Sequence, residues 1–154
     1  MTGTPSPAPA STPSRPLRVA VAGASGRMGR MLIEALRASD DCVLAGALDV
    51  PSSPGIGSDA TAFLGHASGV AITADIAAGL KNADVLIDFT RPEGTLAHLA
   101  VCCELGVKAV VGTTGFTDAQ KAEIAVFAQR TAIVMAPNMS VGVNVTLKLL
   151  QMAA

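Results

Sequence analysis

From residue 17 onward, short apolar runs alternate with stretches in which apolar residues recur at helical spacing. Residues 17–23, LRVAVAG, form an apolar run that ends in glycine, which is typical of a strand buried on both faces. Residues 26–38 predict a helix, because arginines and a glutamate lie opposite its apolar positions. Those apolar positions are Met28, Met31, Leu32, Ala35 and Leu36. Residues 42–49, CVLAGALD, predict a second strand.

The alternation resumes after residues 50–69, a loop rich in Gly, Ser and Pro that carries little pattern. Short apolar runs at residues 70–73 and 85–89 predict strands on either side of a weak helical segment at 75–81. Pro92 then suits the first turn of a further helix. The apolar stripe of that helix consists of Leu96, Leu99, Ala100 and Cys103.

Two more strands, separated by a helix, complete the series. Residues 107–112 and 132–136 are apolar runs that predict strands. Between them, Thr117 and Gln120 form the Thr-x-x-Gln pattern of a capping box, which marks the start of a helix. Repeated strand–helix–strand units predict an α/β fold, a parallel sheet with helices on both faces.

The two ends of the sequence differ from this body. Residues 1–16 hold five of the nine prolines but have neither a cationic start nor an apolar core of a secretory signal, so we expect a disordered leader. Residues 144–154 are apolar on two helical faces, with Val145, Leu149 and Met152 on one and Leu147 and Leu150 on the other. A helix of this kind requires two neighbours. It predicts either further chain or a partner protomer, as in a homo-oligomer.

Composition narrows the class of protein. With 154 residues, 50% of them apolar and 15% charged, the chain suits one well-packed domain. A formal net charge of -1 and the lack of a basic block argue against a nucleic-acid partner. The longest charge-free stretch is interrupted by Pro137 and Asn138, so no membrane span is expected. Three cysteines without a CxxC pattern favour reduced thiols and a cytoplasmic location.

The turn between the first predicted strand and helix has the glycine pattern of a phosphate-binding loop. Residues 23–29 read GASGRMG. Glycines there allow a tight turn and a close approach of the backbone to a pyrophosphate, which the free N–H groups of the helix would bind. Asp49 ends the next strand twenty positions after Gly29, where an acidic residue can accept the ribose hydroxyls. The alternative is an ordinary tight turn followed by an unrelated aspartate.

The residue after Asp49 bears on the choice of nucleotide. Val50 is neutral, whereas binding of a 2′-phosphate calls for a cation beside the acidic residue. The pair therefore favours NADH, with NADPH as the alternative. Arg27 or Arg30 could still reach such a phosphate, or both could be solvated arginines on the polar face of the helix.

Three further loops follow predicted strands, at the sheet edge where open α/β sheets bind ligands. They are residues 88–92 (DFTRP), 112–115 (GTTG) and 136–144 (APNMSVGVN). Thr113 and Thr114 offer hydroxyls and backbone donors between glycines, and Phe89 offers an apolar wall for a ring. Each loop alone could be ordinary turn chemistry.

Taken together, GASGRMG, DFTRPEGT, GTTG and APNMSVGVN, in this order and spacing, resemble bacterial 4-hydroxy-tetrahydrodipicolinate reductase (dihydrodipicolinate reductase) of lysine biosynthesis through diaminopimelate. The resemblance implies a Rossmann-type, doubly wound parallel sheet that binds NADH or NADPH in residues 17–143. It also implies a second domain that binds a cyclic dicarboxylate and carries an HHxxKxDAPSGT-like catalytic segment. That segment is absent from the sequence, so no catalytic residue is expected in this chain. Residues 144–154 would begin the helix that leads to the missing domain.

The resemblance also implies roles for individual residues. The pyrophosphate loop would consist of Gly23, Ala24, Ser25, Gly26, Arg27 and Met28, and Asp49 would bind the ribose. The nicotinamide end would be lined by Gly112, Thr113, Thr114, Ala136, Pro137, Asn138 and Met139. Phe89 and Arg91 would lie beside the cofactor, and Thr114 would in addition face the substrate.

Other functions and sites were weighed against this one. A non-catalytic module that binds NAD(H) and regulates a partner would share the same loop. A semialdehyde dehydrogenase would need a nucleophilic cysteine in a loop, but Cys102 and Cys103 lie inside a predicted helix. His98 and Cys102 are four residues apart without a third ligand, so no metal site is expected. Cys103, Met31 and Met135 are predicted to be packing residues.

Overall fold

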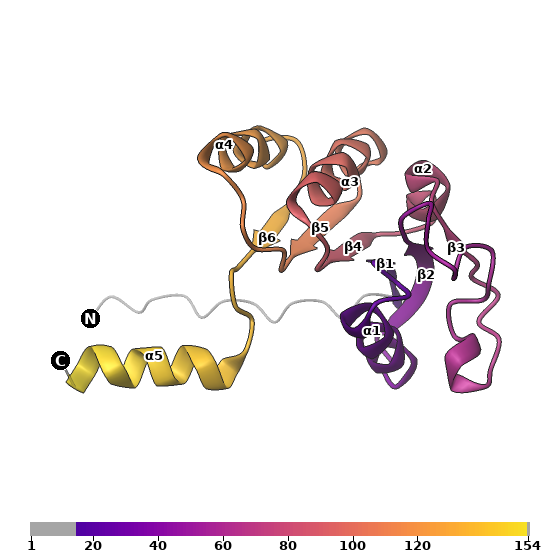
Figure 1. The fold of residues 1–154 in the computed structure, drawn as a ribbon, viewed down its shortest axis with the longest axis horizontal. Coiled ribbons are helices and arrows are strands. Elements are labelled where there is room, and N and C mark those ends of the chain that lie inside the picture. Colours follow the sequence, from indigo (N-terminus) through magenta and orange to yellow (C-terminus); the bar gives the residue numbers. More distant parts are fainter. Residues whose placement is uncertain (1–14, 154) are drawn as a thin grey trace, which may run out of the picture.

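The computed structural model describes residues 15–153, which form one parallel sheet of six strands flanked by helices (Figure 1). The strand order is β3-β2-β1-β4-β5-β6. The strands are β1 Leu17–Ala22, β2 Cys42–Leu48, β3 Ile72–Thr73, β4 Val85–Asp88, β5 Lys108–Val111 and β6 Ile133–Met135. The helices are α1 Arg27–Arg37, α2 Ile76–Leu80, α3 Pro92–Leu105, α4 Asp118–Phe127 and α5 Val141–Ala153. The α/β, doubly wound architecture expected from the sequence is confirmed.

The central strand β1 shows why these sequences form this sheet. It pairs in parallel with both β2 and β4. Val19 and Val21 pack with residues of α1, whereas Ala20 and Ala22 pack on the opposite face with residues of α2 and α3. The helices α2, α3 and α4 lie together on that second face, and α1 lies on the first (Figure 1). An apolar run without alternation is what burial on both faces requires.

Close packing of α2 on the sheet depends on a glycine in the middle of a strand. Gly46 in β2 and Gly79 in α2 face each other, so that a Cβ on Gly46 would collide with the carbonyl oxygen of Gly79. Interior glycines are unfavourable in strands unless another backbone approaches closely. The contact brings α2 onto β2 and sets the height of the helix above this half of the sheet.

The structure corrects the predicted buried face of α1. The buried residues are Gly29, Ile33 and Leu36, whereas Met28 and Met31 are 44% and 65% exposed. The helix is rotated because Gly29 packs against the backbone of Gly23 and Ala24, and this contact turns the two methionines toward solvent. Met135, at the end of β6, is also exposed, at 40%. The prediction that Met31 and Met135 are packing residues is therefore wrong.

A similar correction applies to α3. Its buried residues are Thr95, Leu99 and Cys102, while Cys103 is half-buried and its thiol lies 3.6 Å from the carbonyl oxygen of Phe127. The predicted stripe was drawn through apolar residues alone. It missed Thr95, whose hydroxyl is satisfied inside the core by Thr113.

The loop after β2 contains structure that its sequence pattern did not predict. A short 3-10 helix, Ala62–Leu64, lies within it. The carboxylate of Asp59 accepts hydrogen bonds from the backbone N–H groups of Thr61, Ser68 and Gly69. These bonds hold the pKa of Asp59 well below its ordinary value. A single carboxylate thus orders the part of this segment that follows the buried Ala60.

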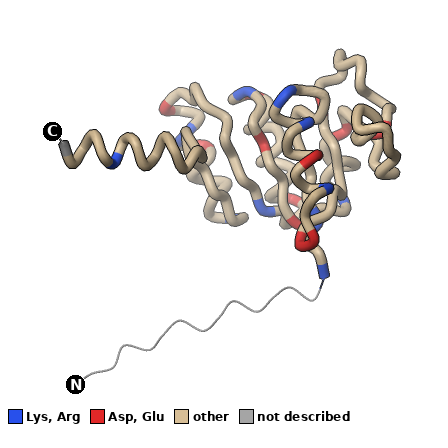
Figure 2. Tube along the Cα trace, turned by 90° about the horizontal axis from the view of Figure 1, so that it is seen from below, with Lys and Arg blue, Asp and Glu red and all other residues tan. Residues whose placement is uncertain are grey.

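The two ends of the described chain lie outside the sheet. The helix α5 begins at Val141, three residues before the predicted start, and projects from the body with Lys148 as its one charged residue (Figures 1 and 2). Its residues from Val141 to Met152 are exposed. The predicted leader, residues 1–16, lies outside the described residues except for Arg15 and Pro16. Arg15 pairs with Asp84 at 2.8 Å.

Among the helices of residues 15–153, none combines the length and the apolar character needed to cross a bilayer.

Candidate functional site

The glycine loop forms a tight turn between β1 and α1, as its sequence predicts. Gly23 has φ of +70°, a conformation that side chains disfavour, and its carbonyl oxygen accepts a 2.9 Å hydrogen bond from the N–H of Gly26. Gly29 has no room for a side chain, because a Cβ there would collide with the carbonyl oxygen of Gly23 and lie 2.8 Å from Cα of Ala24. The glycines therefore bring the first turn of the helix directly onto the loop.

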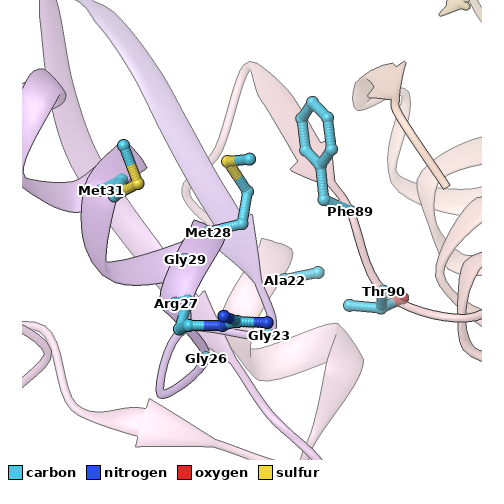
Figure 3. Close-up of a pocket in the computed structure, with 9 residues that line it drawn as sticks. All are labelled: Ala22, Gly23, Gly26, Arg27, Met28, Gly29, Met31, Phe89 and Thr90. Carbon is cyan, nitrogen blue, oxygen red and sulfur yellow. The ribbon is translucent and has the colours of Figure 1, made fainter. Parts of the chain in front are cut away.

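The N-terminus of α1 is left open by its own sequence. Gly26 is the N-cap and makes no side-chain capping bond, and the first turn of the helix holds no acidic residue. Free N–H groups and the positive end of the helix dipole favour an anion at this place. Arg27, at the first position of the helix, is exposed and lies beside Gly23 and Gly26 (Figure 3).

Asp49 lies next to this loop, directly after β2. Its Oδ2 accepts a 2.9 Å hydrogen bond from the N–H of Ser25 and a 3.2 Å bond from the hydroxyl of Ser53, and its Oδ1 accepts one from the N–H of Val50. Burial raises the pKa of Asp49, but these hydrogen bonds outweigh it and hold the pKa below its ordinary value. The carboxylate is therefore ionised near neutral pH and holds the loop as well as facing the cleft.

A cleft of about 1010 Å³ runs along the carboxyl ends of the central strands. Residues of the glycine loop, the end of β2 and the start of α3 all contribute to it. Its lining includes Gly23, Gly26, Arg27, Asp49, Val50, Phe89, Thr90, Arg91 and His98. A smaller hollow of about 520 Å³ lies beside it, where Met28 and Phe89 reach toward the same side (Figure 3). Two cationic side chains, Arg27 and Arg91, thus face a space with a free helix N-terminus.

The loops after β4 and β5 meet at the other side of the glycine loop. Asp88 is in register with Ala22 of β1 and with Val111 of β5, so the loops that follow these strands start side by side. The ring of Phe89 packs directly on Gly112, where a Cβ would collide with it. Phe89 is half-buried. It offers one face of an aromatic wall between the two loops.

The structure brings together most of the residues that the sequence singled out. Gly23, Gly26, Arg27, Asp49, Phe89 and Arg91 line the large cleft, and Met28 lines the smaller hollow. Ser25 contacts Asp49 through its backbone, and Thr114 is exposed next to Gly112. Ala24 and Thr113 are only 2% and 3% exposed, so any contact they make with a ligand would come from the backbone. Their binding roles stay predictions.

The segment of residues 136–139 is set apart from the cleft. It follows β6, which pairs with β5 at the edge of the sheet, and its residues are absent from the lining of either cavity. Met139 is 37% exposed, and Asn138 is half-buried and accepts a 2.8 Å bond from the N–H of Ser140. That residues 136–139 line the nicotinamide end stays a prediction.

Sequence reasoning assigned no individual role to Thr90, within the loop of residues 88–92, or to His98, and both line the cleft. Thr90 donates from both its N–H and its hydroxyl to Oδ1 of Asp88, and His98 hydrogen-bonds to Oδ2 through Nδ1. The available signal was the Asp-x-Thr spacing, which is typical of an Asx turn. His98 was weighed only as a metal ligand, and residues 15–153 hold no group of three side chains suited to a metal.

The lowered carboxylate pKa values predict a loss of stability in acid. In the folded chain the pKa of Asp84 is about 2, because Arg15 and the N–H of Arg18 hydrogen-bond to it, and the pKa values of Asp49 and Asp88 are lowered too. The unfolded chain binds protons on these groups more readily, so their contribution is complete above about pH 4 and declines as the pH falls toward 2.

Thermal melting across this pH range tests the prediction. The melting temperature is expected to be steady between about pH 7 and pH 5 and to fall below about pH 4. Asp84→Asn should flatten part of that decline. A melting temperature unchanged down to pH 2.5 would contradict it.

Comparison with known proteins identifies the family of the chain. The family model "Dihydrodipicolinate reductase, N-terminus" matches residues 17–139. The chain is 64% identical to 4-hydroxy-tetrahydrodipicolinate reductase of Herminiimonas arsenicoxydans and 59% identical to that of Burkholderia pseudomallei (strain 668), over 138 residues in each case. The matches cover 90% of this chain and 52% of each relative, so the chain spans about half the length of these curated relatives.

Solved structures share the fold. A dipicolinate-bound dihydrodipicolinate reductase from Paenisporosarcina sp. TG-14 has a TM-score of 0.68 at 24% identity, covering 90% of this chain and 54% of that one. An NAD-binding protein from Listeria innocua has a TM-score of 0.57 at 20% identity, covering 80% of this chain and 36% of that one. The family match spans all six strands and the glycine loop, and so the chain belongs to the dihydrodipicolinate reductase family, in which it corresponds to the N-terminal part.

Proposed function

We propose that this chain is the nicotinamide dinucleotide-binding half of a 4-hydroxy-tetrahydrodipicolinate reductase. One observation carries the proposal: an open helix N-terminus, a strand-end carboxylate and an aromatic wall line a single cleft at the carboxyl ends of β1, β2 and β4. The strand order reverses between β1 and β4, and open α/β sheets bind ligands at such a point. The family membership and the NAD-binding neighbour of the same fold support it.

In this proposal each part of the nucleotide is assigned to a part of the cleft. The adenosine ribose would lie at Asp49, and the pyrophosphate on the N–H groups of residues 23–28 with Arg27 beside it. The nicotinamide would lie toward Phe89 and the loop of Gly112, Thr113 and Thr114, with residues 136–139 approaching from β6. When bound, the nicotinamide supplies a hydride to the substrate ring. The residues of this chain would orient the nicotinamide and exclude water from it.

The substrate would be bound mainly by further chain. We propose that residues 17–143 form the nucleotide domain and that α5 leads into a domain that binds the cyclic dicarboxylate, with Thr114 as the contact from this side. The exposed apolar residues of α5, such as Leu147 and Leu150, support this, because an apolar helix surface needs a packing partner. The dipicolinate in the Paenisporosarcina structure supports a dicarboxylate.

Calorimetry with both nucleotides tests the cofactor. NADH is expected to bind at least as tightly as NADPH, because Asp49 can accept the ribose hydroxyls and Val50 cannot neutralise a 2′-phosphate. Asp49→Ala should weaken NADH by about 1 to 3 kcal/mol, since charge-assisted hydrogen bonds are lost.

The variant Asp84→Ala is the matched control. It removes another half-buried carboxylate that accepts a hydrogen bond from a backbone N–H, that of Arg18. Asp84 precedes β4, at the end of the sheet opposite to the cleft, so this variant should leave nucleotide affinity unchanged. Tenfold tighter binding of NADPH than of NADH would show that the specificity argument is wrong. Absence of binding by either nucleotide would contradict the proposed function itself.

A further inference from the structure

Three of the four buried polar side chains in the described part of the chain gather at one place. Asp88 and Thr95 are 0% exposed and Thr113 is 3% exposed; the fourth, Thr61, lies in the loop after β2. Asp88 ends β4, Thr95 lies in α3, and Thr113 follows β5. This is the end of the sheet at which the two loops of the proposed nicotinamide site begin.

Hydrogen bonds connect the three side chains. The Thr95 hydroxyl donates to the Thr113 hydroxyl at 2.9 Å, and the Thr113 hydroxyl donates to Oδ1 of Asp88 at 3.4 Å. Oδ1 of Asp88 also accepts from Thr90, and Oδ2 accepts from Nδ1 of His98 at 2.8 Å. One carboxylate therefore holds the loop after β4, the helix α3 and the loop after β5.

A buried charge is not needed to join these three segments. Burial raises the pKa of Asp88, and the bonds from His98 and Thr90 are needed to bring it below its ordinary value. Burying a charge is unfavourable unless every partner is present, and apolar residues of similar volume are often as stable. Around the cluster, Leu86 and Leu99 show that apolar side chains fill the same layer. The cluster does fix a geometry, because each bond constrains the position of its partner.

Resting on the proposed function, we propose that Asp88, Thr95 and Thr113 form a positioning cluster that sets the backbone of residues 112–114 for the nicotinamide. The hydroxyl of Thr113 forms hydrogen bonds within the protein, to Thr95 and Asp88. Its backbone, and the exposed Thr114 that follows, are thereby held toward the ligand. Asp88 and Thr95 act through Thr113 and touch neither nucleotide nor substrate.

The test compares two ligands that differ only at the nicotinamide end. NADH carries the nicotinamide, whereas ADP-ribose has the rest of the molecule without it. Thr95→Val keeps the shape of the side chain but removes its hydroxyl, and it is expected to weaken NADH about threefold to tenfold, the equivalent of one hydrogen bond. Its affinity for ADP-ribose should stay within about twofold of the wild-type value, because the adenosine and pyrophosphate contacts are untouched. Thr95→Ser, which keeps the hydroxyl, should restore NADH binding.

Thr131→Val is the matched control. Its hydroxyl donates a 2.9 Å hydrogen bond to the carbonyl oxygen of Val107, at the opposite end of the sheet. Thr131→Val should lower the melting temperature about as much as Thr95→Val does. It should leave the ratio of NADH affinity to ADP-ribose affinity unchanged. If Thr95→Val does not fold, Thr113→Ala applies the same test, because it removes the other hydroxyl of the pair.

The outcomes separate the two proposals. Failure of the wild-type chain to bind either ligand would contradict the proposed function. If the wild-type chain binds both and the hydroxyl variants weaken both equally, or neither, the cluster is a purely structural feature and the inference is overturned. A selective loss of NADH affinity that Thr95→Ser reverses supports it.

Discussion

Replacing Gly29 with alanine is expected to abolish most of the affinity for NADH and to lower the melting temperature of the chain. The new Cβ would collide with the carbonyl oxygen of Gly23 and lie 2.8 Å from Cα of Ala24. Both are backbone atoms, so α1 must move away from the loop. Overpacking of this kind costs about 1–3 kcal/mol of stability, or roughly 2–12 °C in a chain of this size. The same movement separates the helix N-terminus from the proposed pyrophosphate site.

The expected effect on binding exceeds that on folding. The proposed pyrophosphate contacts are several N–H groups aimed at one point, so a shift of the helix weakens all of them at once. We expect a loss of at least about a hundredfold in NADH affinity, that is about 2.7 kcal/mol or more. Gly142→Ala is the control, because its Cβ in the exposed helix α5 would have only the Ser140 hydroxyl nearby, at 3.8 Å. Wild-type affinity in Gly29→Ala would refute the placement of the pyrophosphate.

The order of helices and strands could be predicted because burial on both faces leaves a simple pattern. Every predicted strand from residue 17 to 136 has a counterpart in the sheet, with ends that differ by one or two residues. Local chemistry also transfers well. The capping box of Thr117 and Gln120 is present with both of its hydrogen bonds, since its geometry depends on four residues alone.

Helix orientation could not be predicted in the same way. For α1 the apolar stripe through Met28 and Met31 competes with one through Gly29 and Ile33, in which the glycine contributes no apolar side chain. The contact that decides is between Gly29 and the loop, which a helical pattern does not contain. In α3, Thr95 breaks the apolar stripe because its hydroxyl has a partner, Thr113, in the loop after β5. Both errors come from tertiary contacts of small or polar residues.

In the candidate site, too, residues with a fixed local spacing could be predicted, whereas residues joined by tertiary contacts could not. Asp49 and the glycine loop could be found because their spacing along one strand–helix–strand unit is fixed by the fold. Asp88 was noticed only as the start of a loop motif, since a strand-end aspartate looks the same in sequence whether it faces solvent or is buried. Its burial depends on Thr90, His98 and Thr113, which come from three separate segments. Such a cluster becomes visible only when the sheet is assembled.

The 154-residue chain is expected to bind NADH yet to show no useful turnover of 4-hydroxy-tetrahydrodipicolinate. Two carboxylates on a substrate call for a convergent set of cations. The proposed nicotinamide end is formed by Phe89, Gly112, Thr113 and Thr114, none of which is cationic. The HHxxK segment that the family resemblance implies is absent from residues 1–154. Hydride transfer would then have to occur to a substrate that the chain does not hold.

The expected loss of turnover is large because the substrate would not be held in attack geometry. Holding two reactants in attack geometry can account for about 7–11 kcal/mol of the lowering of a reaction barrier. On the proposed function the chain would orient only one reactant, the nucleotide, so most of that contribution would be lost. The measurement is an assay of NADH oxidation with freshly generated substrate. The positive control is the longer Herminiimonas relative, 52% of which this chain matches. Calorimetry on the same preparation shows whether NADH binds. Near-normal turnover would mean that the 154-residue chain binds both reactants. The proposal that a further domain binds the substrate would then be wrong.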